Sequence, residues 1–206
     1  AMVAGTITEP QLEDQDTSQW PGLLGDGELA EGQIWEAAMA AEALAAGADM
    51  VITGRLVDSA LTLGPLMHEF GWTDADYDRL SAGSLAGHVI ECGAQATGGN
   101  YAFFTDLPRM GHLGFPIAEV ASDGTSVITK HPGTGGAVTV GTVTAQLLYE
   151  VGGPRYLGPD VTTRLDTITL RADGDDRVSI SGVKGEAPPE TVKVSLNHLA
   201  GTRNEI

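Results

Sequence analysis

The stretch from Leu29 to Thr53 most restricts the fold that this chain can adopt. Leu29 to Ala46 is rich in alanine and glutamate, which favour a helix, and Gly47 is suited to ending it. Ala48 to Thr53 then reads Ala-Asp-Met-Val-Ile-Thr, which is typical of a short buried strand. A helix followed at once by a buried strand is the repeating step of α/β folds. The sequence therefore predicts an α/β fold with a parallel-leaning core.

Three regions follow one another along the 206 residues. Residues 1–28 are acidic and rich in turn-forming residues, so we predict a flexible acidic arm there. Residues 29–153 carry the predicted α/β core, including a hairpin from Ile117 to Thr129 around Asp123-Gly124. Residues 154–206 contain alternating strand-like runs at 168–170, 178–181 and 192–196, separated by Gly, Asp and Pro. This pattern predicts a smaller antiparallel β segment.

The charge of the chain argues against several classes of function. Only 11 Lys and Arg stand against 28 Asp and Glu, which gives a formal net charge of −17. Because nucleic acids and anionic membranes are bound by basic surfaces, the sequence predicts neither kind of binding. No apolar run approaches the roughly 20 residues of a membrane helix, and no signal peptide is visible. With a single cysteine and hence no intrachain disulfide, we expect a cytoplasmic protein.

The segment from Gly83 to Gly99 brings His, Glu, Cys and Gln together within an otherwise small and apolar run. Ser84 is suited to the start of a helix and Gly98-Gly99 to its end, so we predict a buried helix from Ser84 to Thr97. A separate short helix is expected just before it, from Asp74 to Leu80. Polar groups on a buried helix need partners, which are either protein groups or a ligand.

Three polar side chains share one face of that predicted helix: His88, Glu91 and Gln95. His88 and Glu91 are the leading candidates for a general acid–base pair, and Gln95 is a candidate for contacting the substrate. Cys92 is a further catalytic candidate, as the nucleophile of an acyl transferase. Its position in mid-helix gives it no help from the helix dipole, which favours a buried core cysteine instead. A purely structural polar network is the competing interpretation for the whole group.

Arg55 is a candidate for binding an anionic group. It follows Thr53-Gly54 at the carboxyl end of the predicted strand, where open α/β sheets bind ligands. A guanidinium can hold a carboxylate or phosphate in two-pronged fashion. Asp58, three residues further on, belongs to the same candidate site or pairs with Arg55 to close the strand end.

A second candidate anion site begins at Lys130 and continues through a glycine-rich turn. The turn contains Gly133, Thr134, Gly135 and Gly136 and precedes a helix predicted from Ala137 to Val151. Glycines let the backbone approach a ligand closely, and free N–H groups at a helix start favour an anion. A turn that serves only packing is the alternative.

The five histidines show no metal-binding spacing, so neither a metal nor a cofactor is predicted.

Several blocks of the chain resemble the acyclic terpene utilisation (AtuA) family. They occur in the family's order and lie at 47–61, 68–72, 86–99, 114–120, 130–136 and 146–150. Members accompany the breakdown of citronellol- and geraniol-type compounds through branched acyl-CoA intermediates. The resemblance therefore implies acyl-CoA or small-acid metabolism. Family members are longer, which implies that this chain is a fragment or a shortened relative, with a partner subunit supplying the other segments.

Together these observations predict an enzyme that acts on a small acid or a branched acyl-CoA thioester, as a hydratase or dehydratase. His88 and Glu91 would move protons, while Arg55, Lys130 and the glycine-rich turn would hold the anionic part of the substrate. A CoA thioester is expected as substrate only, and the protein is expected to be a homo-oligomer or to bind a partner subunit. The alternative is a non-catalytic subunit or ligand-binding module whose polar helix is structural.

Overall fold

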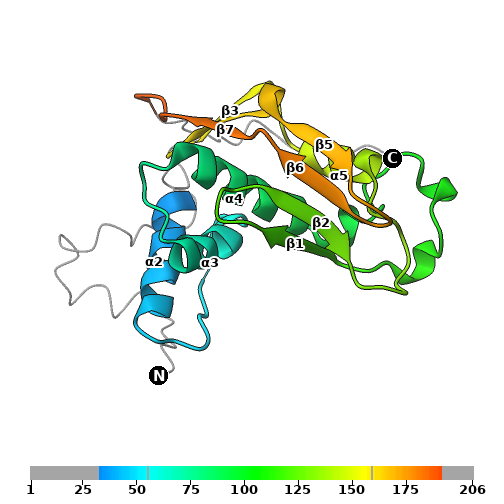
Figure 1. The fold of residues 1–206 in the computed structure, drawn as a ribbon, viewed down its shortest axis with the longest axis horizontal. Helices are drawn as coiled ribbons and strands as arrows, with labels where there is room; N and C mark the ends of the chain where they lie inside the picture. The colour runs from blue at the N-terminus through cyan, green and yellow to red at the C-terminus, as the bar shows by residue number, and fades with distance from the viewer. Residues whose placement is uncertain (1–32, 55, 159, 192–206) are drawn as a thin grey trace, which may run out of the picture.

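A computed structural model describes residues 33–54, 56–158 and 160–191 (Figure 1). The helices of this part are α2 (Gln33–Ala45), α3 (Ala60–Phe70), α4 (Tyr77–Ile90) and α5 (Val140–Leu147). The strands are β1 (Pro116–Val120), β2 (Ser126–Lys130), β3 (Arg155–Leu157), β4 (Thr162–Arg164), β5 (Thr169–Ala172), β6 (Val178–Ser181) and β7 (Lys184–Glu186). The predicted acidic arm, the run at 192–196 and Arg55 lie outside the described residues.

The strands form two sheets, and every pairing between named strands is antiparallel. One sheet has the order β1-β2-β6-β5 and the other β3-β4-β7. The hairpin of β1 and β2 is confirmed, as is the strand predicted at 178–181. The pairing of β2 with β6 joins strands from both sides of residue 153 in one sheet.

The prediction of a parallel-leaning core is wrong. A parallel pair needs a long crossover, whereas β1 and β2 are linked by only residues 121–125. The predicted buried strand at 48–53 does not become a core strand: Met50 and Ile52 are 62% and 63% exposed, and only Val51 makes a bridge. The fold is a mixed one in which helices pack against antiparallel sheets.

Helix α4 replaces the two helices predicted between residues 74 and 97. Gly83 lies inside this helix and packs closely against its neighbours. A Cβ there would come within 2.9 Å of the Leu63 side chain and 3.0 Å of Trp72. The helix ends after Ile90, close to Gly93, whose φ of +55° is the left-handed conformation that stops helices. A 3₁₀ turn, η2 (Gly93–Gln95), follows.

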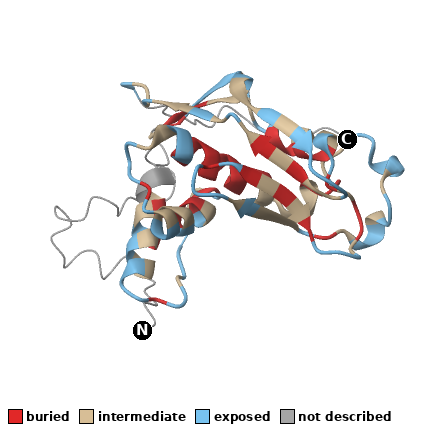
Figure 2. Ribbon diagram, in the orientation of Figure 1, coloured by how far each residue is buried: buried red, intermediate tan, exposed pale blue. Residues whose placement is uncertain are grey.

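Helix α4 is buried around most of its circumference and joins two apolar clusters (Figure 2). Its Leu85 and Val89 pack with residues of β2, β6 and α5, among them Ile128, Ile180 and Val143. On the other side Leu80 packs with Leu63 of α3 and with Trp72, Ala37 and Val161. A helix that is apolar on all sides is typical of a protein interior, as the sequence predicts.

Helix α5 is shorter than predicted, because its ends are set by side-chain chemistry. Thr139 and Thr142 form a capping box in which the Thr142 N–H donates to Thr139 Oγ1 over 3.1 Å. The helix ends at Leu147, and the chain then turns sharply at Glu150, whose φ is +63°. None of the helices in the described ranges is long and apolar enough to cross a membrane.

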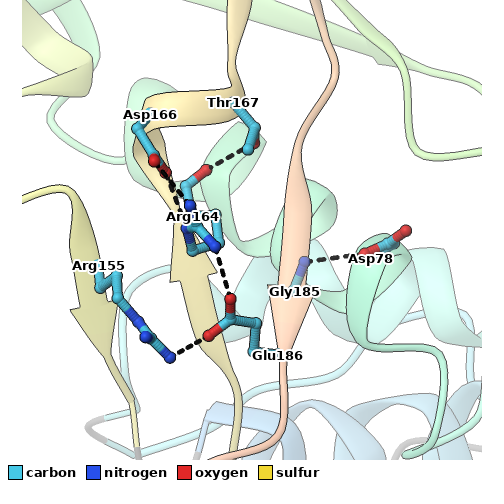
Figure 3. A network of polar contacts seen from close by, with 7 residues as sticks. All are labelled: Asp78, Arg155, Arg164, Asp166, Thr167, Gly185 and Glu186. Atoms are coloured by element: carbon cyan, nitrogen blue, oxygen red, sulfur yellow. Dashed lines mark hydrogen bonds and ion pairs between the residues drawn. The ribbon is translucent and has the colours of Figure 1, made fainter.

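The β3-β4-β7 sheet is tied together and to α4 by a polar network (Figure 3). Arg164 of β4 donates from Nη1 to Glu186 Oε1 of β7 over 2.7 Å, and Arg155 of β3 pairs with the same carboxylate. Asp78 of α4 accepts the Gly185 N–H of β7 over 2.9 Å. These contacts fix the sheet over α4 and so place its inner residues beside that helix.

Candidate functional site

The described residues enclose a pocket of about 250 Å³ beside α4. One wall comes from α4 and the residue after it, and the others come from the segment before α3, the segment after α5, and the β3-β4 region. The lining residues are Val57, Asp58, Ser59, Ser84, Leu85, His88, Glu91, Tyr149, Glu150, Val151, Tyr156, Thr163 and Leu165. The structure thus brings together three residues that the sequence singles out, namely His88, Glu91 and Asp58.

Two buried polar atoms of residues that line this pocket have no hydrogen-bond partner among the described residues. Ser84 Oγ and His88 Nε2 are buried atoms with no hydrogen bond, and they lie one helical turn apart. Ser84 as a whole is only 7% exposed. A buried polar atom without a hydrogen bond costs free energy, on the order of 1–3 kcal/mol. A ligand with a hydrogen-bonding group would remove that cost.

Glu91 directly follows α4 and still has a helical conformation, with φ −60° and ψ −39°. Its position three residues after His88 places both side chains at the same pocket. Glu91 Oε1 also accepts a hydrogen bond from Cys92 Sγ over 2.7 Å. The carboxylate is therefore held in place by its sequence neighbour.

Cys92 does not line the pocket, and its surroundings keep it protonated. The hydrogen bond to Glu91, burial, and the charges of Glu91, Glu150 and Asp58 raise the pKa of the thiol to about 11. Because the thiolate is the nucleophilic form, a thiol held in this way is unreactive at neutral pH. These contacts favour the core-cysteine interpretation over an acyl transferase that uses Cys92.

Gln95 lies away from the His88–Glu91 face, since the chain leaves the helix before it. It belongs to η2 and is not among the lining residues. Its Oε1 is buried and lacks a hydrogen-bond partner among the described residues, as does Nε2 of Gln146. Asn100 Nδ2 donates to Gln146 Oε1 over 3.3 Å. These amides form a second, interior polar group.

Lys130 is a buried residue with protein partners. Its side chain is 3% exposed, and its Nζ lies 2.9 Å from Asp176 Oδ2 and donates to the Thr134 carbonyl over 3.0 Å. Asp176 also accepts the Val138 N–H over 2.9 Å. In this arrangement the ammonium ties the glycine-rich turn to the β5–β6 connection.

Three N–H groups of the glycine-rich turn are also hydrogen-bonded within the protein. Thr134, Gly135 and Gly136 donate to the carbonyl oxygens of His131, His112 and Pro108, respectively. A Cβ on Gly135 would lie 2.1 Å from Arg109 O, and one on Gly136 would lie 2.2 Å from Thr97 O. Glycine is therefore needed at both positions, because another backbone segment passes close to each of them. These contacts lend no support to the predicted anion site. Gly133 has nothing within 4 Å of its Cβ position and a φ of +80°.

Glu150 is a pocket residue that the sequence analysis does not single out. It stands three residues after the end of α5 in the left-handed conformation, and its charge is the first cause of a raised pKa at the Tyr149 phenol. Tyr149, Tyr156 and Thr163 line the pocket with it. No local pattern marks these residues, because only tertiary packing brings them next to α4.

The lining of the pocket is acidic. It includes the carboxyl groups of Asp58, Glu91 and Glu150, and no Lys or Arg is among the described residues that line it. Across the described ranges, no three His, Cys, Asp or Glu residues are grouped in a way that could hold a metal ion. The polar groups of the pocket are thus suited to proton transfer and to hydrogen bonding.

Comparison with protein families identifies the chain. Residues 37–206 match the family described as "Acyclic terpene utilisation family protein AtuA". The chain belongs to the AtuA family. The match includes every residue of the pocket and confirms the resemblance inferred from the sequence blocks. No curated protein and no solved structure matches the chain.

Proposed function

We propose that this AtuA-family chain is an enzyme that adds water to, or removes it from, a branched acyl substrate in the pocket beside α4. The observation that carries the proposal is His88, a residue of the pocket lining whose buried Nε2 has no hydrogen-bond partner among the described residues. An imidazole nitrogen in that state can accept a proton from water or, once protonated, donate one.

Hydration of an activated double bond needs two proton transfers, and the pocket offers two groups for them. A base takes a proton from water as the hydroxyl adds to the β-carbon, and an acid delivers a proton to the α-carbon. His88 and Glu91 lie one helical turn apart and both line the pocket, so they can divide these roles. Removal of water follows the same steps in reverse.

The remaining lining residues suit a small branched chain. Val57, Leu85, Val151 and Leu165 supply an apolar surface. The pocket volume of about 250 Å³ lies just below the range of roughly 300–1,000 Å³ that is typical of small-molecule sites. That size fits a short branched acyl end, and the family's place in acyclic terpene utilisation is consistent with such a substrate.

The test is a hydration assay with methylcrotonyl-CoA, in which the product gains the mass of one water. We expect His88→Gln and Glu91→Gln to lower turnover at least about a hundredfold, which is typical for the loss of a general acid or base. Cys92→Ser should keep full turnover and serves as the matched control, because its side chain does not line the pocket. Circular dichroism on each variant checks that it folds.

Binding of the thioester without any turnover in the unchanged chain would contradict the proposal. It would favour the alternative that the chain is a ligand-binding module. Full turnover in both His88→Gln and Glu91→Gln would likewise place the chemistry elsewhere.

A further inference from the structure

The acidic lining of the pocket restricts the kind of ligand that can enter it. Glu91 and Glu150 both line the pocket, and after the hydrogen bond to Glu91 and burial their charges contribute to the raised pKa of the Cys92 thiol. With no Lys or Arg among the described lining residues, an incoming carboxylate would be repelled and would gain no ion pair.

The atoms of the lining that lack partners belong to a hydroxyl and an imidazole. Glu91 already accepts the Cys92 thiol over 2.7 Å, whereas Ser84 Oγ and His88 Nε2 have no partner within the described ranges. Ser84 is 7% exposed and lines the pocket, and its Oγ is a buried atom. A carbonyl or hydroxyl oxygen of a ligand could bind both atoms.

Glu150 adopts a conformation that glycine would adopt more easily. Its φ of +63° is in the left-handed region. For a residue with a side chain, this conformation costs on the order of 1–3 kcal/mol of folding free energy. The other two described non-glycine residues with positive φ have side chains that hold the structure together. Asp176 binds Lys130 and the Val138 N–H, and Arg109 donates to Thr134 O.

Glu150 is an exposed residue that lines the pocket, where it interacts with the Tyr149 phenol. Glycine is common after a helix in this conformation, so a glutamate there points to a requirement for its carboxylate. A role in selecting the ligand explains both the charge and the position.

We propose that Glu150 is a specificity-determining residue that keeps carboxylates out of the pocket, so that the substrate enters with an uncharged end. This inference rests on the proposed function and deepens it. It assigns the substrate to the class of thioesters or other neutral acyl derivatives and excludes the free acid.

The experiment measures binding of isovaleramide and isovalerate to the 206-residue chain by calorimetry. The two probes have nearly the same shape and differ in charge. We expect the amide to bind at least about tenfold more tightly, which corresponds to about 1.4 kcal/mol. Ser84→Ala should weaken amide binding. Glu150→Gln should tighten isovalerate binding about tenfold and leave amide binding within about twofold.

Two further variants act as controls. Glu119→Gln removes an exposed carboxylate that pairs with Arg177 on the β1-β2-β6-β5 sheet, and it should change neither affinity. Glu150→Gly removes the charge together with the side chain. It should raise the unfolding temperature, while also losing discrimination between the two probes.

Several results would overturn the inference. These are equal binding of both probes to the unchanged chain, binding of neither, or an unchanged preference in Glu150→Gln. Tighter binding of isopentylamine than of isovaleramide would instead identify a site for cations. A Glu150-dependent preference for the amide in a chain that hydrates no thioester would leave the specificity intact and refute the proposed function. Hydration of the thioester together with equal binding of the amide and the carboxylate would support the proposed function and refute the specificity inference.

Discussion

The pair formed by Lys130 and Asp176 yields the sharpest prediction for stability. Lys130 is 3% exposed at its side chain and lies 2.9 Å from a carboxylate that is 39% exposed. At that separation Coulomb's law gives about 1.4 kcal/mol in water and about 5.7 kcal/mol at an effective dielectric constant of about 20. Because only one partner is deeply buried, the effect of losing the charge should fall between these values.

Asp176→Asn removes the charge and keeps the shape, and asparagine tolerates the φ of +52° found here. We expect the free energy of unfolding to fall by about 3 kcal/mol, since the buried ammonium loses its carboxylate partner and keeps only uncharged acceptors such as the Thr134 carbonyl. For a chain of this size, that corresponds to a drop of about 6–12 °C in Tm. Urea unfolding followed by circular dichroism measures the difference.

The matched control is Asp173→Asn. Asp173 lies on the same connection, but it is 56% exposed and 3.9 Å from Arg177, so its loss should cost less than about 0.5 kcal/mol. Combining Asp176→Asn with Lys130→Met should recover most of the stability, because no buried charge remains unpaired. Equal losses in Asp176→Asn and Asp173→Asn would refute the reasoning and reopen Lys130 as a ligand-binding residue.

Two other predictions follow from the surroundings of α4. Alkylation of Cys92 by iodoacetamide should be slow at neutral pH and should accelerate until the pH passes about 11. Glu91→Gln should lower that pH, because the hydrogen bond to Glu91 is the first cause of the raised pKa of the thiol. Rapid alkylation at neutral pH would contradict the assigned hydrogen bond. Gly87→Ala should destabilise the fold by about 1–2 kcal/mol, because the added Cβ would lie 2.8 Å from Ser59 Cα, a backbone atom that cannot move aside. Gly83→Ala, whose nearest neighbour is the end of the Leu63 side chain, should cost less in the same denaturation assay, and the opposite order would be evidence against this packing.

The sequence predicts those parts of the structure that depend on neighbouring residues. The hairpin around Asp123-Gly124 and the strand at 178–181 follow from alternation and turn chemistry, which act over a few residues. The burial of α4 follows from the small and apolar residues that come after Arg79, and the spacing of His88 and Glu91 places both at one pocket. The ordered blocks also identify the family correctly.

Errors arise where distant segments compete with a local pattern. The run at 48–53 has the composition of a buried strand, yet the antiparallel sheets form from segments after residue 115, and Met50 and Ile52 stay exposed. The sequence predicts that the polar helix begins at Ser84, whereas α4 begins at Tyr77 and continues through Gly83, which packs closely against Leu63 and Trp72. Local composition does not record either contact.

The sequence by itself determined the family, the local strands and the acidic character of the chain, because these depend on composition and short-range spacing. Only the tertiary structure decided which charges are paired and which line the pocket. Lys130 is bound by Asp176, a residue 46 positions later, whereas Glu150 reaches the pocket of His88 through a turn after α5. Both assignments depend on contacts between segments far apart in the chain, and no local pattern encodes them.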